Sequence, residues 1–294
     1  MVGAGNLAPT IPNRTIGDKG SILRLNQQIE ATMTAKIFAL CNQKGGVGKT
    51  TTTFHLARAA VLAGQRVLVV DADPQGNVTS VLANGVDEDQ AGLSDALTAS
   101  SSTTLADVTI DGIWDGLRVV PTSGDMLGVV RDELVLAGAG RESRLKNALA
   151  AVRDDYDLVL IDCAPSLDQL TINSLTAADE ALVITQTRLF SANGIAKLLK
   201  NIDLVREHYN PALEIAGMIV NHHEARTLGG AHWAGQIGEA AIKHDVVVFE
   251  PPVPKRAPIA DAMEAAHGLD QWGGDADELA AIYAGFLDTL TKGK

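Results

Sequence analysis

The chain has 294 residues, of which 46% are hydrophobic and 20% are charged, a composition that excludes a disordered chain and allows a sizeable core. Its 24 Lys and Arg residues against 36 Asp and Glu residues give a net charge of −12, so any contact with nucleic acid must be local and sensitive to salt. The 2 cysteines are too few for a disulfide scaffold or a cysteine-based zinc site. No apolar run reaches the roughly 18 residues of a membrane span, and no signal peptide is evident, so we expect a cytoplasmic protein.

Residues 1–35 are expected to form an N-terminal extension, and residues 36–294 a single α/β domain. Residues 1–20 contain several Gly, Pro and Asn residues, which disfavour regular structure, and a short helical pattern follows them. Two interpretations of this extension remain open. It is a flexible tail, or its small excess of positive charge contacts a partner or DNA.

From Lys36 onward, short apolar runs alternate with helical patterns. The apolar runs predict buried strands at 37–41, 67–70, 117–120, 158–161, 181–184, 215–220 and 246–249. The helical patterns predict helices at 50–62, 141–153, 191–208 and 275–290, and the segment 98–107, rich in Ser and Thr, is expected to be a surface loop. Because the strands are apolar on both faces, we expect an α/β fold with a mostly parallel sheet and helices on both of its faces.

Residues 44–51 read Lys-Gly-Gly-Val-Gly-Lys-Thr-Thr and lie between a predicted strand and a predicted helix, which is the context of a P-loop. Glycines let successive backbone amides point at phosphate oxygens, and the helix N-terminus adds a positive dipole end. Lys49 can reach the β- and γ-phosphates, and the Thr50 hydroxyl can ligate Mg²⁺. The segment therefore predicts a site for a nucleoside triphosphate with magnesium.

The loop departs from the general P-loop pattern at its first positions. Gln43 stands where a glycine is expected, and an additional lysine, Lys44, follows it. A second cation beside a triphosphate can neutralise the charge that develops on the transferred phosphoryl group. A lysine at the loop entrance can also cross to a nucleotide on a facing subunit, which would make hydrolysis depend on dimerisation.

Three motifs, in this order along the chain, resemble those of the ParA/MinD family of P-loop ATPases. Residues 44–51 resemble its deviant Walker A motif, and residues 69–77, Val-Val-Asp-Ala-Asp-Pro-Gln-Gly-Asn, look like the DxDPQGN motif of the ParA branch. Residues 156–166, Tyr-Asp-Leu-Val-Leu-Ile-Asp-Cys-Ala-Pro-Ser, are similar to the Walker B segment. The similarity runs from about Lys36 to the C-terminus, and the three motifs together are highly specific.

The resemblance implies roles for individual residues. Lys44, Lys49 and Asp73 would be catalytic, with Lys44 acting across an ATP-bound dimer and Asp73 orienting the attacking water. Thr50 and Asp162 would hold Mg²⁺, with helix capping as the alternative for the two aspartates, and Asn221 and Pro254 would contact adenine unless they belong to ordinary turns. The nucleotide contacts would come from Lys44, Gly45, Gly46, Val47, Gly48, Lys49, Thr50, Thr51, Asn221 and Pro254.

Members of this family are similar in binding DNA non-specifically as ATP dimers, with a ParB-type centromere-binding partner that stimulates hydrolysis. The candidate DNA contacts here are Arg188, Lys197, Lys200, Arg206 and Arg226. The acidic Asp203 among these residues weakens the prediction of DNA binding. The alternative interpretation is that these basic residues lie on helix faces that are simply exposed to solvent. Residues 257–291 carry seven acidic residues and no Lys or Arg, which argues against a basic membrane-binding helix and predicts that their apolar positions pack on the body.

We therefore expect a homodimeric, Mg²⁺-dependent ATPase that partitions plasmid or chromosomal DNA, hydrolyses ATP slowly without its partner, and associates with the nucleoid. Two alternatives remain open. The cargo could be a protein, or the chain could be a metabolic enzyme of the same fold that transfers phosphate to a small molecule. The spacing of His222, His223 and His232 fits no standard zinc motif. Cys41 and Cys163 are expected to be buried fillers.

Overall fold

The computed structural model describes residues 34–87, 89–187, 192–224 and 227–292. The chain divides into two compact units, residues 1–34 and residues 35–294. Apart from Thr34, the first unit lies outside the described residues, so the interpretation of residues 1–35 as an extension stays a prediction. The helices and strands of the described residues belong to the second unit.

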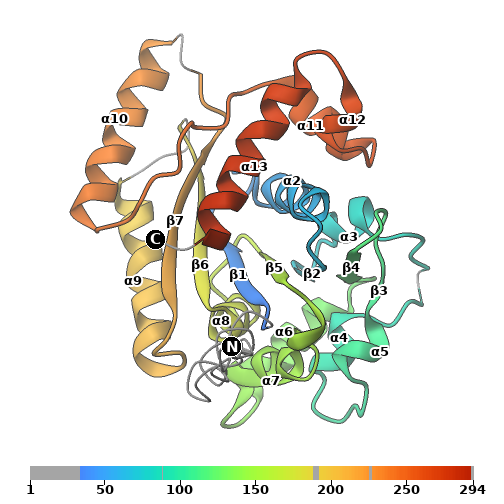
Figure 1. Cartoon of the computed structure of the whole chain (residues 1–294). Helices are drawn as coiled ribbons and strands as arrows, with labels where there is room; N and C mark the ends of the chain where they lie inside the picture. Colours follow the sequence, from blue (N-terminus) through green and yellow to red (C-terminus); the bar gives the residue numbers. More distant parts are fainter. Residues whose placement is uncertain (1–33, 88, 188–191, 225–226, 293–294) are drawn as a thin grey trace, which may run out of the picture. The chain divides into compact units, whose positions relative to one another are not determined.

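Within the described ranges, seven strands form one sheet in the order β3-β4-β2-β5-β1-β6-β7 (Figure 1). Their bounds are β1 Lys36–Cys41, β2 Val67–Ala72, β3 Ile110–Asp111, β4 Leu117–Val120, β5 Leu158–Cys163, β6 Glu180–Gln186 and β7 Glu214–Asn221. Only the pair β3 and β4 is antiparallel; the other neighbouring strands run parallel. The predicted α/β class with a mostly parallel sheet is therefore confirmed.

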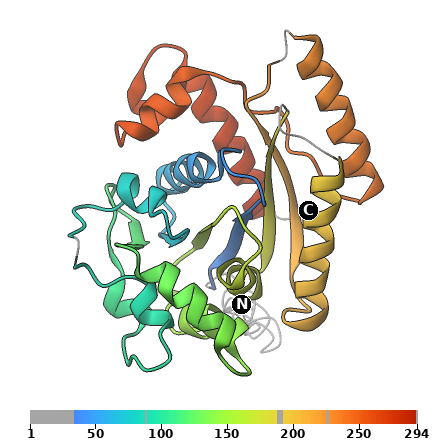
Figure 2. The same ribbon diagram turned by 180° about the vertical axis from the view of Figure 1, so that it is seen from behind.

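Helices cover both faces of the sheet (Figures 1 and 2). One face carries α2 Lys49–Leu62, α3 Asn77–Leu82, α11 Ala257–Glu264, α12 Leu269–Trp272 and α13 Ala276–Lys292. The other face carries α4 Leu93–Leu97, α5 Leu105–Val108, α6 Met126–Leu136, α7 Arg144–Ala150, α8 Gln169–Ala177, α9 Ala192–His208 and α10 Leu228–Lys243. Short 3₁₀ turns, η1 Arg141–Ser143 and η2 Arg153–Asp155, flank α7.

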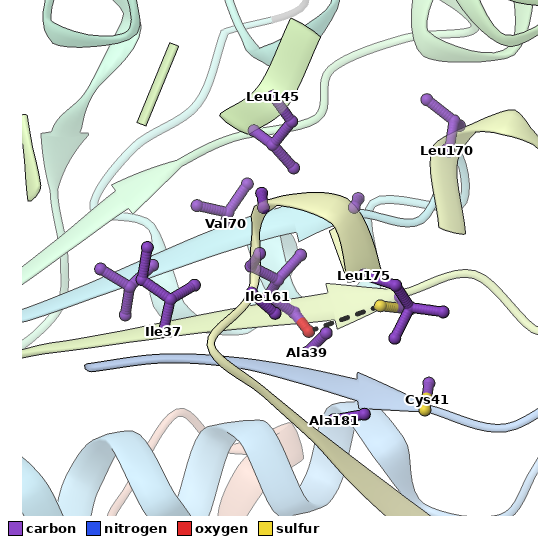
Figure 3. Close-up of a cluster of buried hydrophobic side chains, with 14 of the residues drawn as sticks. Ile37, Ala39, Cys41, Val70, Leu145, Ile161, Leu170, Leu175 and Ala181 are labelled. Carbon is purple, nitrogen blue, oxygen red and sulfur yellow. Dashed lines mark hydrogen bonds between the residues drawn. The ribbon is translucent and has the colours of Figure 1, made fainter. Parts of the chain in front are cut away.

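Each central strand contributes side chains to two hydrophobic cores, because successive side chains of a strand point to opposite faces. In β1, Ile37 and Cys41 belong to the core under α4–α10, whereas Phe38 and Leu40 belong to the core under α2, α3 and α11–α13. Figure 3 shows Ile37 and Cys41 within the first of these cores. This two-sided burial explains why the strands read as continuous apolar runs instead of alternating ones.

The two cysteines end neighbouring strands and are buried and free, as the sequence predicts. Burial raises the pKa of the Cys41 thiol to about 12 and raises the pKa of the Cys163 thiol as well. The Cys163 thiol lies 3.8 Å from the carbonyl oxygen of Ile161. Both side chains therefore act as small apolar fillers, because only a thiolate is a good nucleophile or metal ligand.

Three expectations about secondary structure need correction. Residues 246–249 form no strand: Val248 makes a single parallel bridge to Met218, because Pro251 and Pro252 follow and cannot donate to a ladder. The expected loop 98–107 ends in α5, whose first residue Leu105 is buried. The predicted helix 141–153 consists of α7 and its two flanking 3₁₀ turns.

The last helix packs on the body as expected. Leu279, Tyr283, Phe286, Leu287 and Leu290 of α13 are each at most 4% exposed and join the core that contains α2. Across the described parts of the chain, no helix is both long enough and apolar enough to cross a membrane.

Candidate functional site

The loop between β1 and α2, residues 42–48, turns sharply at the carboxyl end of the central strand. Asn42 supports it: its Nδ2 donates to the Ile184 carbonyl at 2.6 Å, and its Oδ1 accepts from the Lys44 amide at 3.0 Å. Gly46 and Gly48 have φ of 70° and 88°, values that favour glycine. The loop leads directly into the first turn of α2, where unpaired backbone amides can receive an anion.

Asn221, the last residue of β7, holds this loop from the other side. Its Nδ2 lies 3.0 Å from the Val47 carbonyl, 3.3 Å from the Gly48 carbonyl and 3.0 Å from Thr52 Oγ1. A Cβ added to Gly48 would lie only 2.6 Å from the same nitrogen, so the contact requires glycine. The amide nitrogen of Asn221 is thus engaged by the loop, whereas its buried Oδ1 has no hydrogen-bond partner among the described residues, and its contact with adenine stays a prediction.

Thr50 and Asp162, the two predicted magnesium ligands, lie together. Thr50 Oγ1 donates to Asp162 Oδ2 at 2.7 Å, and Thr53 Oγ1 donates to Oδ1 of the same carboxylate at 3.2 Å. Asp162 is 1% exposed, and burial raises its pKa, against the hydrogen bond from Thr50 and the charge of Lys49. Hydroxyl and carboxylate oxygens are hard ligands of the kind that Mg²⁺ prefers.

The predicted catalytic residues lie at the same edge of the sheet. Lys49 is 7% exposed, and its charge acts on Asp162. Asp73 is 8% exposed, its Oδ1 accepts from the Gln75 amide at 3.0 Å, and its charge raises the pKa of Asp162. Lys44 is half-buried at the start of the loop. A site with two lysines and two carboxylates at a helix N-terminus suits the transfer of a phosphoryl group.

A further network behind Asp73 escaped the sequence analysis. Asp71 is fully buried; its Oδ1 accepts from the Asp73 amide at 3.2 Å, and its Oδ2 accepts from the Thr79 amide and hydroxyl at 2.9 and 2.6 Å. Thr79 Oγ1 in turn accepts from the Thr122 amide at 2.9 Å, and Thr122 Oγ1 donates to the Asp71 carbonyl at 2.7 Å. The network ties the Asp73 loop to α3 and to the loop after β4.

Burial raises the pKa of Asp71, and the neighbouring charge of Asp162 raises it further. The two aspartates are paired in register across β2 and β5. One sequence signal could have found Asp71, namely an acid at the end of an otherwise apolar run. No comparable signal exists for Thr79 and Thr122, which lie 43 residues apart in the chain.

Known proteins with similar sequences also indicate a nucleotide site at this edge of the sheet. The sequence model of a family described as an AAA domain matches residues 35–215. The chromosome partitioning protein ParA of Caulobacter vibrioides is 38% identical over 228 residues, which cover 74% of this chain and 84% of that protein. The chain belongs to the ParA-type P-loop ATPases. The sporulation initiation inhibitor protein Soj of Bacillus subtilis is 40% identical over 201 residues, covering 65% of this chain and 74% of Soj.

Solved structures share the ParA-type fold. Cobyrinic acid a,c-diamide synthase from Mycobacterium smegmatis, solved with a bound ATP analog and magnesium, has a TM-score of 0.72 at 30% identity over 86% of this chain and 93% of that chain. An ATP complex of Cyanothece McdA has a TM-score of 0.78 over 87% and 96% of the two chains. At 23% identity, the second likeness concerns the fold alone.

In this ParA-type chain, Pro254 lies beside the segment that follows Asn221. The His223 amide donates to the Val253 carbonyl at 2.9 Å, and the Lys255 amide donates to the His223 carbonyl at 3.0 Å. Asn221 and Pro254 are therefore brought into neighbouring segments, although they lie 33 positions apart in the sequence. Within the described ranges, no group of three or more His, Cys, Asp or Glu residues could hold a metal ion.

The candidate DNA contacts of this ParA-type chain are not equivalent. Lys197 and Lys200 of α9 are exposed. Arg206 Nε donates to the Leu213 carbonyl at 2.7 Å, and its Nη1 lies 3.2 Å from Asp203 Oδ1, so this guanidinium is already engaged. Arg188 and Arg226 lie outside the described residues.

Proposed function

We propose that this ParA-type ATPase binds ATP with Mg²⁺ at the edge formed by residues 44–51, Asp73 and Asp162, and uses hydrolysis to partition DNA. The observation that carries the proposal is the contact of Thr50 with Asp162 at 2.7 Å beside the buried Lys49. Relatives named as chromosome partitioning proteins support the proposal that hydrolysis is used to partition DNA. A structural relative that holds an ATP analog with magnesium supports the identity of the ligands.

Each residue has a distinct task in this proposal. Thr50 and Asp162 hold the magnesium ion, which when bound supplies positive charge against the phosphates. Lys49 neutralises the same phosphates from the first turn of α2. Asp73 accepts a hydrogen bond from the attacking water, since the Asp71 carboxylate and the Gln75 amide fix the loop that carries it.

Lys44 acts on the nucleotide of a facing subunit, so that ATP closes a homodimer and hydrolysis opens it. A cation contributed in trans stabilises charge only when both subunits are closed, which couples turnover to assembly. A ParB-type partner stimulates this step. The closed dimer brings together Lys197 and Lys200 of both subunits, with Arg188 and Arg226 as further candidate contacts, and binds nucleoid DNA without sequence preference.

The molecular mass of the Asp73→Ala variant in solution tests whether ATP closes a dimer. This variant should bind ATP without hydrolysing it, so light scattering should show a dimer with ATP and a monomer with ADP or without nucleotide. The unchanged protein, which turns ATP over, serves as the control and should dimerise only transiently. A chain that stays monomeric with every nucleotide would contradict the proposal.

DNA binding is tested by titration with and without ATP at two salt concentrations. Binding should require ATP and fall steeply with salt, because it rests on contacts with phosphates. Equal binding in both nucleotide states would defeat the partition function. The 30% identity to a structure named as a cobyrinic acid a,c-diamide synthase favours a metabolic enzyme as the second candidate. ATP turnover that rises with a small acceptor instead of DNA would establish that alternative.

A further inference from the structure

A cavity of about 260 Å³ lies along the second half of α2, where this helix meets α12 and α13. Its apolar wall includes Ala59, Leu62, Leu269 and Ala280, and its polar wall includes His55 and Tyr283. None of these residues belongs to the nucleotide site described above. The cavity nevertheless shares α2 with that site, since α2 begins at Lys49 in the phosphate loop.

Tyr283 carries an unused hydrogen-bonding group in the wall of this cavity. The side chain is 2% exposed, and burial raises its pKa. Its hydroxyl makes no hydrogen bond with the described residues and is not one of their fully buried polar atoms without a partner, so it faces the accessible space of the cavity and can bond to an occupant. An occupant with one polar atom would supply that partner.

Two rings, those of His55 and Tyr283, lie side by side in the wall of the cavity. The Tyr283 ring lies against His55 with centroids 4.7 Å apart. His55 Nε2 donates to the Ile259 carbonyl at 2.9 Å, which fixes the orientation of the ring, and burial lowers the pKa of His55 to about 4. The wall is therefore neutral and aromatic at pH 7, a surface suited to a flat ring.

The lining of the cavity also includes three charged residues, Arg58, Asp270 and Asp277. Arg58 and Asp270 neutralise each other through two contacts of 2.9 and 2.6 Å. Asp277 is exposed and lines the same cavity, and it forms no ion pair within the described residues. It belongs to the stretch 257–291, which has seven acidic residues and no Lys or Arg, a feature that the nucleotide site does not explain.

We propose that this cavity binds a small aromatic molecule that carries a primary amine. The ring enters the apolar space, a ring N–H donates to the Tyr283 hydroxyl, and the ammonium group faces Asp277. An engineered cavity of about 150 Å³ in another protein admits benzene, so a cavity of about 260 Å³ has room for two fused rings. The ligand would contact α2, the helix that begins at Lys49 in the phosphate loop.

Calorimetric titration of the full chain with tryptamine tests the proposal. Saturable binding with a Kd below about 1 mM is expected for a ligand of this size. Indole-3-acetate has the same ring and the opposite charge, and should bind at least about tenfold more weakly, because Asp277 repels it. Tyr283→Phe keeps the ring and removes only the hydroxyl, which should weaken tryptamine binding about three- to tenfold.

A matched pair of α13 variants locates the site. Ala284→Leu places a larger side chain in the lining and should weaken tryptamine binding by at least about tenfold. Thr289→Leu adds a leucine at an exposed position of the same helix outside the cavity, and should bind tryptamine like the unchanged chain. Absence of saturable binding, equal affinity for the two ligands, or unchanged binding by Ala284→Leu would overturn the proposal, whatever the outcome of the DNA experiments.

Discussion

The phosphate-loop edge and the exposed face of α9 both present positive charge, but they hold it in opposite ways. At the edge, Lys49 is 7% exposed and acts on Asp162, which is 1% exposed and bonded to two threonine hydroxyls. On α9, Lys197 and Lys200 are exposed to solvent. Charges in a buried site interact strongly, whereas exposed charges are screened within about 10 Å at moderate salt.

This difference in burial indicates where ligand specificity can arise in this chain. A buried and bonded set of charges is positioned before the ligand arrives, so it can favour one ligand and one transition state. Exposed lysines can only add affinity for any polyanion. We therefore expect changes at the loop to alter chemistry by orders of magnitude, and changes on α9 to alter affinity by small factors.

The largest effect is expected from Lys44→Ala. ATP turnover should fall about a thousandfold, because a cation that stabilises the transferred phosphoryl group contributes at least this much in related chemistry. ATP affinity should change less than about threefold, since Lys49 and the loop amides remain. Steady-state turnover and calorimetric titration measure the two quantities, and Lys146→Ala, an exposed lysine of α7, is the control. Parallel losses of affinity and turnover would assign Lys44 to ground-state binding instead.

The next effect is a loss of folding stability at low pH, caused by His55 in helix α2. His55 has a pKa of about 4 in the folded chain against 6.5 when exposed, so its contribution to stability is fully present above pH 6.5 and is lost as pH falls toward 4. The difference of about 2.5 pKa units amounts to about 3 kcal/mol, of which about 2 kcal/mol is lost between pH 7 and pH 5. Urea unfolding at several pH values measures this loss.

His55→Gln and His244→Gln separate this effect from general acid sensitivity. The first variant should unfold with a weaker dependence on pH, because the titrating group is gone. The second changes an exposed histidine and should keep the dependence of the unchanged chain. An identical pH dependence in all three proteins would show that the burial of His55 does not control acid stability.

A smaller effect is expected from Thr79→Val, which breaks the network behind Asp73. The change leaves the buried Asp71 carboxylate and the Thr122 amide each short of one hydrogen bond, at a cost of about 1.5 kcal/mol. Turnover should fall about tenfold with ATP affinity nearly unchanged, because the Asp73 loop loses its fixed position. Thr79→Ser should restore both stability and turnover, and Ser80→Ala at the exposed neighbour is the control. Failure of Thr79→Ser to rescue would refute the positioning role.

The smallest effect belongs to the α9 face. Lys197→Ala and Lys200→Ala should each weaken DNA binding about threefold at low salt and reduce the slope of log affinity against log salt by about one. ATP turnover in the absence of DNA should not change. Fluorescence anisotropy with labelled DNA at several salt concentrations measures the slope, with Lys146→Ala as the matched exposed lysine. Unchanged DNA binding in both α9 variants would move the DNA surface elsewhere.

The local patterns of the chain predicted most of the fold. Six of the seven expected strands exist within a few residues of their predicted bounds, because a strand buried on both faces reads as an apolar run. The seventh failed because Pro251 and Pro252 interrupt the ladder beside β7. The two-residue strand β3 could not be foreseen, since its Ile-Asp sequence carries no periodic signal.

The phosphate loop could be predicted from local sequence, because its glycines, lysines and threonines are contiguous and their spacing sets their geometry. The contacts that support this loop come from distant parts of the chain and could not be predicted in this way. Asn221 contacts the carbonyl of Val47 from 174 residues away, and Thr79 meets Thr122 across 43 residues. Such contacts depend on the order in which strands pair, and that order follows from the packing of helices over the whole sheet instead of from any local pattern.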